Sequence, residues 1–111
     1  MSRIAVFFAE GYEEIEALTV VDICRRAGVE VQMVSVSGAK VVNSSHGVGV
    51  QMDMSFEEVN FDSLDMIVLP GGMPGTRNLE AHEGLMAQVD AFDQAGRYLA
   101  GGASVSGWVF R

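Results

Sequence analysis

The sequence predicts an α/β fold in which a parallel sheet is sandwiched by helices. Two continuous apolar runs, residues 4–8 and 64–69, have the composition of strands that are buried on both faces, as in parallel sheets. Amphipathic helical patterns lie between the predicted strands. This alternation within 111 residues favours one domain whose strands are joined by right-handed crossovers.

The first half of the chain contains a strand, a helix, a second strand and a hairpin. A helical pattern follows the strand at 4–8 and ends before Gly28, a residue typical of helix ends. Residues 29–36 alternate as a second strand. Residues 41–42 and 48–50 resemble a hairpin inserted into the pattern. The predicted buried face of the helix consists of Ala17, Val20, Cys24 and Ala27.

The second half contains a short helix, a strand, a longer helix and a last strand. Ser55 and Glu58 have the spacing of a capping box, which predicts a short helix. After the strand at 64–69, a helix is predicted over 83–95 and a fourth main strand from Arg97 to Ala100. We therefore assign residues 1–100 to the α/β domain and 101–111 to a divergent Gly/Ser-rich tail, so that the fold is truncated after its fourth main strand.

Composition excludes several classes of function. The net charge of −8 disfavours electrostatic binding to nucleic acid or to an anionic membrane. A single cysteine excludes an internal disulfide and a multi-cysteine zinc site, which fits a reducing compartment. No signal peptide or membrane span is evident, so we expect a cytoplasmic protein. The acidic segment 10–14 after the first strand would repel a phosphate, and we therefore expect no nucleotide, flavin or other cofactor.

The segment Leu69-Pro70-Gly71-Gly72 is the sharpest local signal. It follows a buried strand directly, at the carboxyl edge of the sheet, where open α/β sheets bind ligands. Consecutive glycines allow backbone N–H groups to turn toward a bound oxygen, as in an oxyanion hole. The alternative is an ordinary strand-to-loop turn rich in proline and glycine.

Glu13, Glu14 and Glu16 cluster at the start of the first helix. Acidic residues at this position stabilise the helix dipole, which is the simpler interpretation. The functional alternative is that one carboxyl points over the sheet edge, stays protonated after partial desolvation and donates to a neighbouring nucleophile.

The remaining reactive side chains have ordinary interpretations. Cys24 lies on the apolar helix face and is expected to act as a small hydrophobic residue. His46 and His82 have no convincing ligand spacing, so we expect surface histidines and no metal site. Residues 102–106 nearly match a nucleophile elbow around Ser104, but the fifth position is serine and no triad partners follow. We expect a flexible tail there.

Five motifs carry a resemblance to a known family, and they lie at residues 8–17, 21–22, 26–28, 65–72 and 96–100. Together they resemble the ThiJ/PfpI superfamily, most closely its parkinsonism-associated deglycase branch, over nearly all of residues 4–100. The resemblance implies a flavodoxin-like fold, as in class I glutamine amidotransferases. It also implies that Glu16 hydrogen-bonds a catalytic cysteine, that Gly71 and Gly72 help to form the oxyanion pocket, and that the protein is a homodimer acting on small reactive carbonyls.

The chain departs from this superfamily where the nucleophile is expected. By offset, Ala103 occupies the cysteine position, and the similarity ends after Ala100. We interpret the chain as a frameshifted or truncated product that lacks glyoxalase or deglycase activity. The alternative is a non-catalytic, self-associating scaffold with a chaperone-like or stress-response role, because a half-length sheet leaves an edge and an apolar face uncovered.

Overall fold

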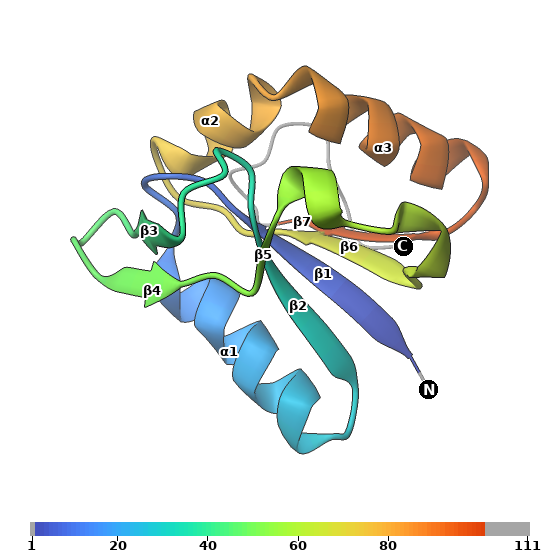
Figure 1. Cartoon of the computed structure of the whole chain (residues 1–111), viewed down its shortest axis with the longest axis horizontal. Helices are drawn as coiled ribbons and strands as arrows, with labels where there is room; N and C mark the ends of the chain where they lie inside the picture. Colours follow the sequence, from blue (N-terminus) through green and yellow to red (C-terminus); the bar gives the residue numbers. More distant parts are fainter. Residues whose placement is uncertain (1, 102–111) are drawn as a thin grey trace.

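A computed structural model describes residues 2–101, and its centre is a five-stranded, all-parallel sheet (Figure 1). The strand order is β5-β2-β1-β6-β7, and a separate antiparallel hairpin pairs β3 with β4. The α/β fold predicted from the sequence is therefore confirmed. The strands are β1 (Arg3–Phe8), β2 (Glu30–Ser35), β3 (Val41–Asn43), β4 (Gly49–Gln51), β5 (Met54–Ser55), β6 (Met66–Leu69) and β7 (Tyr98–Gly101); the helices are α1 (Glu14–Arg26), α2 (Gly75–Glu80) and α3 (Glu83–Gln94).

Helices cover both faces of the sheet, with α1 on one face and α2 and α3 on the other (Figure 1). Side chains alternate across a strand, so β1 contributes to two separate cores. Ile4, Val6 and Phe8 pack with α1, whereas Ala5 and Phe7 pack with α2 and α3. This two-sided burial explains why the run at residues 4–8 is continuously apolar.

The predicted face of α1 is only partly correct. Ala17 and Val21 are its buried residues, Val20 and Cys24 pack at the margin of the core, and Ala27 is an exposed C-cap. The helix begins and ends close to the predicted boundaries. Glu13 caps its first turn by accepting a hydrogen bond from the Ile15 amide at 2.8 Å.

Between the hairpin and β6 the structure differs from the prediction. Instead of a short α-helix there are two 3₁₀ turns, η1 (Phe56–Glu58) and η2 (Phe61–Ser63). The capping pair does exist, because the Glu58 carboxylate accepts from both the amide and the hydroxyl of Ser55 at 3.0 Å. Three-residue turns leave no helical periodicity to detect, and the two-residue strand β5 is equally short.

Helix α2 was also missed by the sequence analysis. It begins directly after the cis peptide bond Met73–Pro74 and spans only six residues. Its sequence, GTRNLE, contains one large apolar residue, Leu79, which is fully buried. A single apolar position cannot establish a helical period.

The β3–β4 hairpin is fixed to the loop that leads from β1 into α1. The Gly11 amide donates to the Asn43 carbonyl oxygen at 2.9 Å, and the Ser45 amide donates to the Tyr12 carbonyl oxygen at 2.9 Å. The Glu10 carboxylate accepts from the Asn43 amide. These contacts place the hairpin tip beside the first turn of α1.

Arg97 joins the start of β7 to the η2 turn. Its guanidinium donates to the carbonyl oxygens of Phe61 and Leu64, and it stacks 4.0 Å from the Phe92 ring centroid. None of the helices within residues 2–101 combines the length and apolarity that crossing a bilayer would require.

Candidate functional site

Two loops meet at the carboxyl edge of the sheet. Strands β1, β6 and β7 are adjacent and parallel, with Val6 paired to Val68 and Val68 to Ala100. The loops that leave β1 and β6, residues 9–13 and 70–74, therefore emerge side by side. This edge is where open parallel sheets bind ligands.

The two loops pack backbone against backbone. The Glu13 amide donates to the Gly71 carbonyl oxygen at 3.0 Å, and the Gly75 amide donates to the Gly11 carbonyl oxygen at 3.1 Å. A Cβ at Gly72 would lie 2.8 Å from the Glu13 nitrogen, and one at Gly75 would lie 2.7 Å from the Tyr12 Cα. Only glycine allows this approach, which explains part of the Pro/Gly-rich pattern.

The contact between Glu16 and Gly71 links α1 to the β6 loop. The Glu16 Oε1 accepts a hydrogen bond from the Gly71 amide at 3.2 Å across 55 residues of sequence. Glu16 lies in the first turn of α1 and is exposed. The structure thus brings together two of the residues selected from the sequence. An oxyanion at the Gly71 amide would compete with the Glu16 carboxylate for the same N–H.

The other residues selected from the sequence fall at different places. Gly72 adopts a positive φ of 96°, and its carbonyl oxygen accepts from the Thr76 amide at 2.9 Å, so it also initiates α2. Ala103 and Ser104 lie outside the described residues, and their predicted roles stay predictions.

An apolar groove of about 390 Å³ runs from Glu16 along α1 toward the amino ends of β1 and β6. Cys24 lines it and packs at the margin of the core, as the small hydrophobic residue predicted. The lining is almost entirely aliphatic and consists of Ile4, Ile15, Glu16, Thr19, Val20, Cys24, Met66, Val68, Leu69, Pro70 and Ala100.

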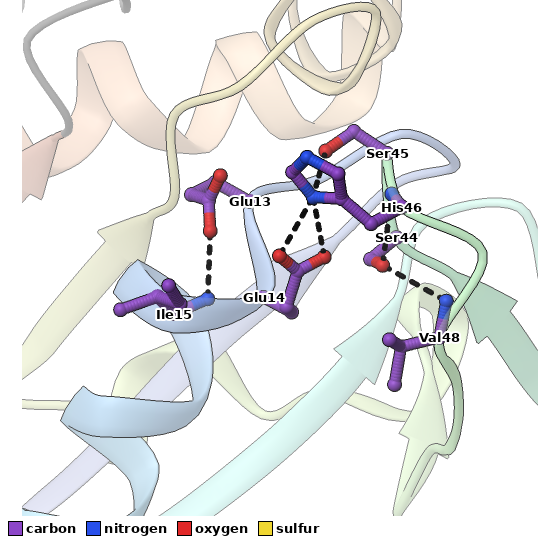
Figure 2. Close-up of polar contacts among 7 residues, drawn as sticks. All are labelled: Glu13, Glu14, Ile15, Ser44, Ser45, His46 and Val48. Carbon is purple, nitrogen blue, oxygen red and sulfur yellow. Dashed lines mark hydrogen bonds and ion pairs between the residues drawn. The ribbon is translucent and has the colours of Figure 1, made fainter.

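A second cluster of polar side chains was missed by the sequence analysis. His46 Nδ1 lies 2.8 Å and 3.1 Å from the two carboxylate oxygens of Glu14, and Glu13 lies beside them (Figure 2). Ligand spacing along the sequence could not reveal this group, because 32 residues separate His46 from Glu14. The hairpin contacts described above are what bring them together.

The pKa of the Glu14 carboxyl is lowered from its ordinary value. The Ser44 hydroxyl, which hydrogen-bonds the carboxylate, is the largest cause; His46 contributes a hydrogen bond and its charge, and partial desolvation opposes both. The pKa of the Tyr12 hydroxyl is raised. Burial is the main cause, and the negative charges of Glu14 and Glu10 raise it further.

His82 is not the simple surface histidine that was expected. Its Nδ1 accepts from the Leu85 amide at 3.0 Å, so it caps α3, and its ring lies 4.4 Å from that of Phe56. Histidine is an uncommon N-cap, and its role could not be recognised from residue type.

The fold and the edge site define an α/β protein with a flavodoxin-like parallel sheet. A model of the DJ-1/PfpI family matches residues 2–101, and the chain belongs to this family. It is 32% identical over 95 residues to protein DJ-1 homolog B of Arabidopsis thaliana and 33% identical over 70 residues to the deglycase TK1284 of Thermococcus kodakarensis. These alignments cover 86% and 63% of this chain.

Solved structures agree with this assignment. Oxidized DJ-1 of Toxoplasma gondii superimposes with a TM-score of 0.86 at 35% identity and covers 91% of this chain. The chain spans only 22% and 42% of the two curated relatives and 55% of the Toxoplasma structure. It therefore corresponds to part of each of these proteins.

We predict that Gly72→Ala destabilises the fold more than Gly28→Ala. Both glycines have positive φ, 96° and 82°, which costs alanine about 1 kcal/mol. Only at Gly72 would the new Cβ also collide with the Glu13 backbone, which adds about 1–3 kcal/mol. Urea denaturation of both variants checks the difference. Equal losses of unfolding free energy would contradict the backbone packing described here.

We also predict that Ser44→Ala raises the pKa of Glu14 toward its ordinary value. Because the wild-type pKa is lowered in the folded state, the carboxylate stabilises the fold above its ordinary pKa, and this contribution disappears as pH falls through the lowered pKa. The variant should therefore lose less stability on acidification. NMR titration of the Glu14 carboxyl measures the pKa directly. An unchanged value would show that Ser44 is not the cause.

Proposed function

We propose that this chain carries one half of a DJ-1/PfpI reactive-carbonyl site and that the 111-residue chain itself is not a catalyst. The observation that supports this most directly is the hydrogen bond from the Gly71 amide to Glu16. It holds the acidic partner and the predicted oxyanion loop together without any thiol. A relative of this chain is named a deglycase, which supports small reactive carbonyls as the proposed substrate class of the complete site.

The absence of turnover follows from the position of the only thiol. Covalent thiol catalysis requires a thiolate within hydrogen-bond reach of its acid–base partner. Cys24 follows Glu16 by eight residues on α1, which corresponds to about 12 Å along the helix. Its side chain lines the apolar groove and packs at the margin of the core. By the family resemblance, the nucleophile position is Ala103, which has no reactive group.

We therefore expect no conversion of methylglyoxal to lactate above the buffer rate, and the same result for Glu16→Gln. Asp22→Asn, which removes an exposed carboxyl of the same helix, is the matched control. Lactate formation by the wild type that survives in Asp22→Asn and disappears in Glu16→Gln would overturn the proposal. Activity that disappears in Cys24→Ser would do the same.

A second function, self-association as a non-catalytic module, is favoured by the surface. Ile15 and Ile23 on α1 are 71% and 58% exposed, and Val41 and Val48 of the neighbouring hairpin are 50% and 43% exposed. The apolar groove adjoins this surface, since Ile15 lines it. Large exposed apolar patches mark interaction sites, and we propose a homodimer formed through them.

We expect light scattering at micromolar concentration to give a dimer for the wild type and a monomer for Ile23→Glu. The substitution places a charge within the proposed interface without disturbing the core. Ala91→Glu, which introduces the same side chain at an exposed position of α3 on the opposite face of the sheet, should stay dimeric. A monomeric wild type would contradict the proposal.

A further inference from the structure

Glu13, Glu14 and His46 bring three metal-ligating groups together at the hairpin tip. One ligand atom from each side chain lies within 4.8 Å of the others. The Glu14 carboxylate points at the His46 ring, and the Glu13 side chain lies beside them (Figure 2). Two come from the start of α1 and one from the turn between β3 and β4, so the cluster joins two elements and differs from an acidic run along one helix.

The carboxylates are held in place before any ion binds. Glu13 uses one oxygen, Oε1, to cap the Ile15 amide at 2.8 Å, which fixes its side chain and leaves Oε2 for another partner. Glu14 is only 16% exposed, and both of its carboxylate oxygens contact His46 Nδ1. The Ser44 hydroxyl oxygen accepts from the amides of His46 and Val48 at 3.3 and 3.0 Å, which holds the turn that carries His46. Ligands that are positioned in advance lower the cost of coordination.

The hairpin is positioned independently of the histidine. The backbone hydrogen bonds Gly11–Asn43 and Tyr12–Ser45 link it to the loop before α1. Tyr12 and Ser44 also form a parallel bridge. The hairpin backbone therefore keeps its position beside the two carboxylates when the His46 ring rotates, and that ring is 69% exposed.

The distances fit an ion of moderate size. Zinc binds nitrogen and oxygen at about 2.0–2.2 Å in tetrahedral geometry, which sets ligand atoms about 3.3 Å apart. His46 Nδ1 now lies 2.8 Å from Glu14, a hydrogen-bond length, and the group spans at most 4.8 Å. A small rotation of the exposed imidazole lets a metal ion replace the shared proton between Nδ1 and Glu14.

We propose that Glu13, Glu14 and His46 Nδ1 form a binding site for a divalent transition-metal ion of the zinc type, completed by water. An imidazole nitrogen selects such ions over magnesium and calcium, which prefer all-oxygen sites. The two carboxylates offset the charge of the ion. The site shares no ligand with the Glu16–Gly71 contact, so its existence does not depend on the proposed function.

Calorimetric titration of the metal-free 111-residue chain with Zn²⁺ tests this directly. We expect one site per chain, with His46→Ala, His46→Gln and Glu14→Gln each weakening affinity about tenfold or more, because removing even a residue that only hydrogen-bonds a metal ligand weakens affinity that much. Cys24→Ser and Asp22→Asn should bind like the wild type. Mg²⁺ and Ca²⁺ should bind much more weakly. Thermal unfolding of each metal-free variant establishes that it is folded.

A second measurement identifies the ligand atom. Long-range ¹⁵N correlation spectra should show that Zn²⁺ shifts the Nδ1 resonance of His46 more than its Nε2 resonance and leaves His82 unchanged. Wild-type affinity in folded His46→Gln, loss of binding in Cys24→Ser, equal affinity for Mg²⁺ and Zn²⁺, or a zinc-induced shift at His82 alone would each overturn the proposal.

Discussion

The close approach of the two loops at the carboxyl edge is the constraint on which the site depends. Residues 9–13 and 70–74 contact each other through main-chain atoms, and Gly11, Gly72 and Gly75 are the positions without side chains that allow it. This contact places the start of α1 against the end of β6. The Glu16 hydrogen bond and the apolar groove both depend on that placement, because each is formed by residues of α1 and residues at the end of β6.

Three glutamates in one helical turn have three different partners. Glu13 caps the helix, Glu14 contacts the hairpin, and Glu16 contacts the β6 loop. Successive helical residues point about 100° apart, so side chains one and three positions apart reach different neighbours. The sequence could suggest helix-dipole stabilisation for all of them, but the structure shows that each also holds a separate element against α1.

Sequence reasoning succeeded where a long period or a strong local motif existed. The continuous apolar runs predicted β1 and β6. The resemblance selected Glu16 and Gly71 for separate roles, which stay predictions, and the structure shows that the two residues share a hydrogen bond. Sequence reasoning failed for α2 and the 3₁₀ turns, which are too short to show a period. It also failed for His46, because the partners of a side chain across a hairpin depend on tertiary contacts. Those contacts are main-chain hydrogen bonds, which leave little trace in residue type.

The central position of β1 has a consequence for synthesis on the ribosome. Ile4 pairs with Val31 on one side and with Met66 on the other, a separation of 62 positions. At about 5–20 residues per second, roughly 3–12 s elapse between the emergence of these partners. During that interval the central strand of the sheet has one edge and one face without its native neighbours. The nascent chain is therefore most prone to aggregation before β6 emerges, which makes this a stage at which a holding chaperone would have the greatest effect.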